Sequence, residues 1–311
     1  MVVEIAGAPP AGSPSLTRRP IADGPRGMRR APDLADNAVL VAREMLSPTV
    51  ARLVVRPDAG VGPFVAGQYL ALGVRIDDRV VQRPYSTASD PAAADSHEFL
   101  VRRVPDGALT PRLWTLPVGA RVHLGPPKGT FTLVAGDRKP HLFVATGTGI
   151  APFLGMLRTL ARRPEPPRTI LLHGAARVED LVCGDDIADL APGGLSITYV
   201  PTISRPDDPA NRGWSGRTGR AEAVLASVLR SAGLAPGGGL APARGLAVRG
   251  LGPGGISAYL CGNPGMVAAA EAVLLEHGIP AADIHAERYW TAPSATGESS
   301  AAGAIVGAGP A

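Results

Sequence analysis

The apolar pattern of the chain changes near residue 139, and this change constrains the fold more than any other feature of the sequence. Between residues 39 and 134, short β-branched runs alternate with turn residues, as expected for strands of a small antiparallel barrel. The predicted strands occupy residues 39–46, 50–57, 67–76, 79–86, 97–104 and 120–125. This half of the sequence therefore predicts an antiparallel β-barrel.

Beyond residue 139, buried apolar strands alternate with amphipathic helices, which is typical of a parallel sheet covered by helices. Strands are predicted at 141–146, 169–174, 196–203, 257–262 and 283–289, and helices at 152–163, 221–230 and 265–278. A chain of 311 residues with 45% hydrophobic residues can fill two cores. We therefore predict a two-domain fold, with the antiparallel β-barrel over residues 36–138 and an α/β Rossmann-like doubly wound parallel sheet over residues 139–290.

Three segments are expected to lie outside the packed domains. Residues 1–35 are rich in Pro, Ala, Gly and Arg without helix or strand period, and residues 291–311 are mostly Ala, Gly and Ser. We expect both to be disordered extensions. Residues 234–255 are a tract of Gly, Pro and Ala that interrupts the second domain, and we expect a surface insertion there.

Charge and cysteine content exclude several classes of protein. The net charge of +4 suits an anionic cofactor or an acidic protein partner, but an arginine-rich proteome would give the same charge by default, so charge alone decides nothing. Cys183 and Cys261 are far apart in sequence, so neither a disulfide framework nor a Cys-built metal site is indicated, and we expect no metal. Because no apolar run approaches the roughly 18 to 20 residues of a membrane span, we expect a cytoplasmic protein that does not bind a membrane. We also expect it to bind no nucleic acid. The sequence does not fix the oligomeric state, and a monomer is the default expectation.

The string Arg83-Pro84-Tyr85-Ser86 ends one of the predicted barrel strands. Arg offers a planar fork to a pyrophosphate, Tyr a flat face to an aromatic ring, and Ser a hydroxyl to a ring nitrogen. A flavin dinucleotide needs these three contacts. The alternative is a barrel strand that runs into a turn, and the four residues alone do not decide between the two.

Two glycine loops join predicted strands to predicted helices. In residues 145–152, glycines would allow close approach to a phosphate, and the next helix presents free N–H groups. The spacing is not GxGxxG, so the dinucleotide fingerprint is not indicated, and a tight turn is the alternative. In residues 261–266, Cys261 lies at the carboxyl end of a strand, where doubly wound sheets bind ligands. The alternative there is a buried structural cysteine before a well-capped helix.

Taken together, RPYS, GTGIAPF and CGNPGM occur in the order and at the separations of the ferredoxin-NADP reductase superfamily. With VPDGALTPRL, HGAAR and AERYW, residues 36–290 most resemble the bacterial ferredoxin/flavodoxin-NADP reductases. The resemblance implies FAD and NADP(H) as cofactors. It also implies hydride transfer between NADPH and flavin N5, followed by single-electron transfer to a ferredoxin or flavodoxin partner.

The resemblance assigns Arg83 to the FAD pyrophosphate, Tyr85 to the isoalloxazine face and Ser86 to the neighbourhood of N5. The other FAD-binding candidates are Pro84, Val101, Arg103, Ala108, Leu109, Thr110, Thr148, Tyr289 and Trp290. The NADP-binding candidates are Gly147, Gly149, Ala176, Arg177, Ser204, Arg205, Arg220, Gly262, Asn263 and Met266. The catalytic candidates are Ser86, Cys261 and Glu287. Glu287 matches an acidic position linked with proton supply to the flavin, and an exposed strand glutamate is the alternative.

Coenzyme choice depends on the adenosine end of the coenzyme, where a 2′-phosphate needs cationic or hydroxyl donors and a bare ribose usually meets a carboxylate. Arg177, Ser204, Arg205 and Arg220 match these positions and favour NADP. The chain is rich in arginine, so a solvated surface role is the alternative for each one singly.

Several functions share these motifs. An NAD(P)H-flavin reductase or an oxygenase-linked reductase has the same fold, and a flavin-binding redox sensor with little turnover belongs to another class. A siderophore-iron reductase is disfavoured by HGAAR together with AERYW. Arg75, Arg79 and Arg112 are candidates for docking an acidic electron carrier, and ordinary solvated arginines are the alternative.

Overall fold

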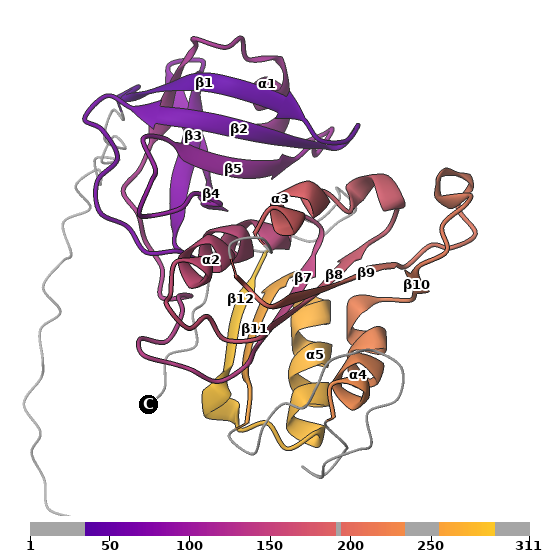
Figure 1. Cartoon of the computed structure of the whole chain (residues 1–311). Coiled ribbons are helices and arrows are strands. Elements are labelled where there is room, and N and C mark those ends of the chain that lie inside the picture. The colour runs from indigo at the N-terminus through magenta and orange to yellow at the C-terminus, as the bar shows by residue number, and fades with distance from the viewer. Residues whose placement is uncertain (1–34, 191–193, 234–254, 290–311) are drawn as a thin grey trace, which may run out of the picture. The chain divides into compact units, whose positions relative to one another are not determined.

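The computed structural model describes residues 35–190, 194–233 and 255–289 (Figure 1). Only residue 35 of the expected N-terminal extension and only Gly255 of the insertion at 234–255 are among the described residues. Trp290 and the whole tail from residue 291 lie outside them. The described residues belong to a single compact unit. Among them, no helix is long and apolar enough to cross a membrane.

The first sheet is antiparallel and contains the strands that the sequence predicts. Its strands are β1 (Ala38–Met45), β2 (Val50–Pro57), β3 (Tyr69–Ile76), β4 (Arg79–Ser86), β5 (His97–Arg102) and β6 (Arg121–Leu124), in the order β4-β3-β6-β1-β2-β5. Thr87, just after β4, forms an isolated antiparallel bridge with Phe99 on β5, so the two edge strands also meet. This bridge gives the sheet its barrel-like closure.

Alternation along the barrel strands explains why they bury one face. On β2, Leu53 and Val55 are buried, whereas Arg56 between Val55 and Pro57 is exposed. Such period-2 alternation is what a half-buried strand requires. A short helix, α1 (Thr110–Thr115), follows β5 and buries Leu113 in the same core.

The second sheet is parallel and confirms the predicted α/β fold. Its strands are β7 (His141–Thr146), β8 (Thr169–Ala175), β9 (Ile197–Ile203), β10 (Arg217–Thr218), β11 (Ser257–Gly262) and β12 (Ile284–Arg288), in the order β10-β9-β8-β7-β11-β12. Its helices are α2 (Ala151–Ala161), α3 (Gly184–Ala188), α4 (Ala221–Ser231) and α5 (Pro264–Glu276), with single 3₁₀ turns at Gly147–Ile150, Val178–Asp180, Pro209–Asn211 and Ala281–Asp283. The sequence does not predict the two-residue β10 or the short α3.

Helices cover both faces of this sheet (Figure 1). Phe143 and Ala145 of β7 pack in the cluster that contains α2, whereas Leu142 and Val144 pack in the cluster that contains α4 and α5. Successive side chains of a strand point to opposite faces, so a fully apolar strand fills both layers. In the sheet, β7 lies between β8 and β11, so the order of the strands reverses at β7. The carboxyl ends of β7 and β11 therefore form the topological switch point, where open α/β sheets bind ligands.

Candidate functional site

The structure brings the three predicted catalytic residues together from separate strands. Ser86 ends β4, Cys261 lies on β11 and Glu287 lies on β12. The Ser86 hydroxyl donates to Oε2 of Glu287 at 2.9 Å, and the Cys261 sulfur is 3.7 Å from the same oxygen. The Tyr289 hydroxyl is 2.8 Å from Ser86 Oγ. We call these four residues the Ser86–Glu287 cluster.

Burial controls the protonation of this cluster. Glu287 is only 3% exposed, so it is not a solvated strand residue. Desolvation raises the pKa of Glu287 to about 7, while hydrogen bonds from Ser86 and Cys261 act in the opposite direction. Desolvation also raises the pKa of the Cys261 thiol well above its usual value, so it remains protonated. The cluster therefore has one group, Glu287, that can gain or lose a proton near neutral pH.

The candidate flavin-binding residues lie along β4, β5 and the start of α1. Arg83 is exposed, and its Nη1 donates to the carbonyl of Gln82 at 2.8 Å. The Tyr85 ring is 6.4 Å from Phe99 in an edge-to-face arrangement, and burial raises the pKa of Tyr85 to about 12, so its phenol stays neutral. The Thr87–Phe99 bridge links the segment directly after β4 to β5, the strand that carries Val101. An exposed cationic fork and a neutral ring two residues apart on β4 fit a flavin dinucleotide.

A closed turn follows β5 and carries the remaining predicted flavin contacts. The Thr110 hydroxyl accepts from the backbone N–H of Val104 at 2.9 Å and is 3.0 Å from the carbonyl of Val104. This side chain fixes the backbone of Ala108 and Leu109 directly before α1. Arg103 is exposed at the start of the same turn.

The two glycine loops pack directly against each other at the switch point. A Cβ at Gly149 would lie 2.3 Å from the carbonyl oxygen of Cys261, and a Cβ at Gly262, where φ is +143°, would lie 2.2 Å from Thr146 Oγ1. These two glycines therefore allow the two loops to pack closely against each other. The three atoms nearest to the Cβ position of Gly147, where φ is +53°, belong to the Arg102 guanidinium, the first at 3.5 Å.

The second loop begins the helix α5 in the way that the sequence suggests. Asn263 caps the helix, with Oδ1 accepting from the N–H of Gly265 at 2.9 Å, and Pro264 follows in the first turn. The N–H of Asn263 donates to Thr146 Oγ1 at 3.1 Å, which joins the second loop to the end of β7. Met266 is buried beneath this loop, and Thr148 lies in the 3₁₀ turn of the first loop.

His173 and Arg102 are site residues that the sequence analysis missed. His173 is fully buried on β8, with Nε2 3.0 Å from the carbonyl of Gly147 and Nδ1 3.1 Å from the Tyr199 hydroxyl. Burial lowers the pKa of His173 to about 4, so a neutral ring donates from Nε2 to Gly147 and accepts at Nδ1 from Tyr199. The Arg102 guanidinium lies beside Gly147 and pairs with Asp180 at 3.2 Å.

The candidate residues for the adenosine end follow β8 and β9. Asn211 joins the two loops, because its amide nitrogen donates to the carbonyls of Ala176 at 3.1 Å and Arg205 at 2.6 Å. Ser204 and Arg205 are exposed on the second loop. Arg220 precedes α4, is 79% exposed and lies 3.9 Å from Glu222.

Arg177 lies against acidic side chains. Its Nε donates to Oδ2 of Asp208 at 2.9 Å, and its Nη1 is 3.8 Å from Oε1 of Glu179. The sequence analysis found three arginines and no acid at the matching positions, whereas the structure brings Asp208 and Glu179 to Arg177. The pairing becomes visible only when the loops after β8 and β9 are brought together.

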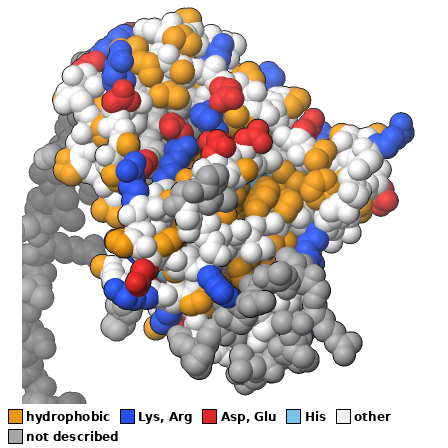
Figure 2. Space-filling model, in the orientation of Figure 1, with side chains coloured by type: hydrophobic (Ala, Val, Ile, Leu, Met, Phe, Trp, Pro, Cys, Tyr) orange, Lys and Arg blue, Asp and Glu red, His pale blue; other side chains and the backbone are white. Residues whose placement is uncertain are grey.

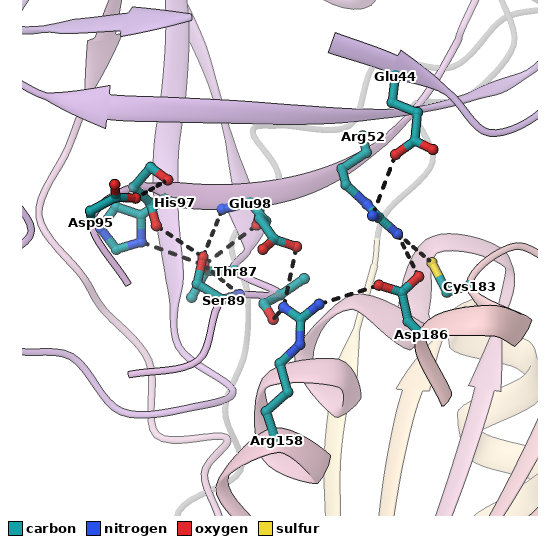
Figure 3. A network of polar contacts seen from close by, with 12 residues as sticks. Glu44, Arg52, Thr87, Ser89, Asp95, His97, Glu98, Arg158, Cys183 and Asp186 are labelled. Carbon is teal, nitrogen blue, oxygen red and sulfur yellow. Dashed lines mark hydrogen bonds and ion pairs between the residues drawn. The ribbon is translucent and has the colours of Figure 1, made fainter. Parts of the chain in front are cut away.

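A polar network fixes the segment after Ser86 against the parallel sheet (Figure 3). Arg158 of α2 donates to the carbonyl of Ala88 at 2.8 Å and pairs with Glu98 of β5 at 3.2 Å. Its other terminal nitrogen is 3.3 Å from Asp186 of α3, which also binds Arg52 of β2 at 2.5 Å. The network connects both sheets and so holds β4 in position relative to β12.

The candidate docking arginines are spread over the barrel surface. Arg79 and Arg112 are exposed, and Arg75 pairs with Asp36 at 3.4 Å. On the face drawn in Figure 2, basic and acidic side chains are interspersed, and neither sign dominates. A docking role for these arginines stays a prediction.

Comparison with known proteins agrees with this geometry. Residues 37–133 match the family model of the oxidoreductase FAD-binding domain, and residues 143–272 match that of the oxidoreductase NAD-binding domain. The chain is 35% identical over 254 residues to ferredoxin–NADP reductase B of Sorangium cellulosum, covering 81% of this chain and 96% of that protein.

Oxygenase-associated reductases are also similar. The reductase component DmpP of phenol 2-monooxygenase from a Pseudomonas species is 32% identical over 257 residues, covering 82% of this chain and 65% of that protein. The crystal structure of the Amycolatopsis cytochrome P450 reductase GcoB superposes with a TM-score of 0.66 at 28% identity, covering 81% of this chain and 68% of that one.

Proposed function

The chain belongs to the ferredoxin-NADP reductase family, and from this premise we propose that it oxidises NADPH through FAD and reduces a ferredoxin or flavodoxin. We further propose that residues 36–138 hold FAD and that residues 139–290 hold the nicotinamide coenzyme. The matches of two family models to these two halves support the division. The observation that carries the proposal is the buried Ser86–Glu287 cluster at the switch point.

The residues present fit the two cofactors. An exposed Arg83 and a neutral Tyr85 ring on β4 suit a pyrophosphate and an aromatic ring, respectively. The side chain of Arg102 lies beside Gly147 and adds a positive charge there, which suits a pyrophosphate. When bound, FAD supplies the change from two-electron to one-electron transfer.

In this proposal the protein provides orientation and a proton site. Ser86 offers a hydroxyl held in place by Glu287 and Tyr289. Glu287 holds a proton below about pH 7 and releases it above. Cys261 is fully buried and stays a neutral thiol beside Glu287. Tyr289, the fourth member of the cluster, lies within hydrogen-bond distance of the Ser86 hydroxyl.

An oxygenase-linked reductase is the second candidate, since similarity to a phenol monooxygenase reductase component and to a cytochrome P450 reductase favours it. The assay that separates the candidates measures NADPH-dependent turnover with purified ferredoxin, flavodoxin, cytochrome P450 and free flavin as acceptors. We expect saturable turnover with ferredoxin or flavodoxin. Fast turnover with an oxygenase partner alone would replace the first proposal with the second. A flavin that stays oxidised with NADPH would point instead to a redox sensor.

A further inference from the structure

The adenosine end of the site contains a carboxylate that binds the same guanidinium expected to meet a coenzyme phosphate. Asp208 Oδ2 accepts from Arg177 Nε at 2.9 Å. The Arg177 side chain is 40% exposed, so a ligand can reach it, whereas the Asp208 side chain is 17% exposed. The guanidinium therefore has one partner already in place on its Nε edge.

The Asp208 carboxylate is fixed by its own loop. Its second oxygen, Oδ1, accepts from the N–H of Ala210 at 3.0 Å and caps the turn Pro209–Asn211. Asn211 at the end of that turn is 3% exposed and accepts from the N–H of Val178, the residue after Arg177, at 2.7 Å. Hydrogen bonds from Ala210 and from Arg177 lower the pKa of Asp208, which keeps it ionised. Asp208 cannot swing away without loss of the cap.

The two nicotinamide coenzymes differ only at this end. The 2′-phosphate of NADPH carries about −1.5 to −2 charges near neutral pH and binds best to two nitrogens of one guanidinium. A carboxylate on the Nε edge occupies one of the two bidentate edges of the guanidinium and repels the phosphate. The 2′-hydroxyl of NADH, by contrast, can donate to a carboxylate. Asp208 thus weakens the binding of NADPH and offers a hydrogen-bond acceptor to NADH.

We propose that Asp208 is a specificity-determining residue that limits the preference for NADPH by competing with the 2′-phosphate for Arg177. This inference rests on the proposed function, because it assumes that the loops after β8 and β9 receive the adenosine end. Asp208 restrains a selectivity that Arg177 and its neighbouring arginines supply.

The test compares Asp208→Asn with the neighbouring control Asp207→Asn in the full-length, FAD-loaded protein. Asparagine keeps an oxygen that can cap Ala210 but removes the charge. Asp207 is exposed, and Asp207→Asn removes the same charge one residue away from Asp208. Calorimetric titration with adenosine 2′,5′-bisphosphate and with 5′-AMP measures binding of the adenosine end alone. Steady-state kcat/KM with NADPH and NADH measures selectivity.

We expect Asp208→Asn to tighten binding of adenosine 2′,5′-bisphosphate roughly threefold to tenfold and to raise the NADPH-to-NADH selectivity by the same factor, because partly exposed charges interact by about 1 kcal/mol. Binding of 5′-AMP and the behaviour of Asp207→Asn should change less than about twofold. In an Arg177→Gln background, the effect of Asp208→Asn should disappear, because the competition acts through Arg177.

Four results would overturn the inference. If Asp208→Asn bound the bisphosphate with unchanged affinity, Asp208 would have no effect on phosphate binding. If it bound the bisphosphate more weakly, Asp208 would orient Arg177 for the phosphate. Equal effects in Asp207→Asn would mean a general charge effect. If the effect of Asp208→Asn persisted in the Arg177→Gln background, competition for Arg177 could not be its cause. If the unaltered protein binds neither the bisphosphate nor NADPH, the proposed function fails as well, and that outcome is distinct from the other four.

Discussion

At the scale of single residues, the chemistry depends on how one carboxyl group is buried. Glu287 lies among Ser86, Cys261 and Tyr289, and its pKa of about 7 reflects desolvation that two hydrogen bonds only partly offset. The same carboxyl on an exposed strand would be ionised at all physiological pH values. Its position therefore converts an ordinary glutamate into a proton site that works near neutral pH.

We predict that Ser86→Ala moves the titration of Glu287 upward. The hydrogen bond from Ser86 lowers the pKa of Glu287, so its removal leaves desolvation less opposed. The pH profile of kcat/KM should show an inflection near 7 in the unaltered protein, shifted up by roughly half a unit to one unit in the variant. Glu287→Gln should remove this inflection. An inflection that survives in Glu287→Gln would assign the titration to another group.

The same pKa predicts the direction of a stability change. Folding raises the pKa of Glu287 above its unfolded value, so the protonated form favours the folded state and ionisation opposes it. This contribution is lost as pH rises from about 4.5 through about 7. Glu287→Gln should therefore gain thermal stability relative to the unaltered protein as pH increases from 5 to 8. A constant difference in Tm over this range would contradict the raised pKa.

At the scale of elements, the strands that the sequence predicts correctly are those with continuous or alternating apolar residues, such as β7 and β2. The two-residue β10 and the five-residue α3 are too short to give a period. The Gly loops and the RPYS string locate Ser86 and Cys261 because each carries a local pattern. Their meeting with Glu287 required the family resemblance, since nothing local links three strands.

Residues that act through tertiary contact could not be predicted. His173 lies 26 positions from the carbonyl of Gly147 that it supports, and Asp208 lies 31 positions from Arg177. Neither residue belongs to a motif with a mechanism of its own. The close contact between the two glycine loops was equally invisible in the sequence, because Gly149 and Gly262 each pack against the other loop.

For the loop at the end of β7, we predict that His173→Phe raises KM for NADPH roughly fivefold to tenfold, since the Gly147 carbonyl loses a buried hydrogen bond. FAD content and the flavin spectrum should not change. His285→Phe is the matched control, because His285 stacks on Tyr259 near the amino end of the sheet and a phenyl ring can keep that stacking. Equal effects of both variants on KM would mean a general loss of stability rather than loop positioning.

At the scale of the whole molecule, Asp186 is one of the side chains that connect the barrel to the α/β half. Asp186 of α3 binds Arg52 of the barrel and Arg158 of α2, and Arg158 in turn binds Glu98 and the carbonyl of Ala88 (Figure 3). Ala88 lies two residues after Ser86. The network therefore couples the relative position of the two sheets to the geometry of the Ser86–Glu287 cluster.

We predict that Asp186→Asn lowers the free energy of unfolding by about 1 to 3 kcal/mol, because two partly buried arginines lose a shared carboxylate. It should also slow hydride transfer without altering the pKa of Glu287. Asp185→Asn is the control, as Asp185 is exposed in the same helical turn. Denaturant unfolding and rapid mixing with NADPH measure the two effects. Indistinguishable values for the two variants would show that the network does not connect the sheets energetically.

The central claim is that this chain carries FAD that NADPH reduces at the Ser86–Glu287 cluster. The most direct measurement is the absorbance of the purified, FAD-reconstituted protein during anaerobic rapid mixing with NADPH, with NADH as control and Ser86→Ala as variant. We predict that the flavin absorbance decreases on the time scale of rapid mixing with NADPH and decreases more slowly with NADH. In Ser86→Ala the NADPH step should slow at least roughly tenfold. A protein that binds no flavin after reconstitution, or flavin that NADPH reduces equally fast without the Ser86 hydroxyl, would contradict the account.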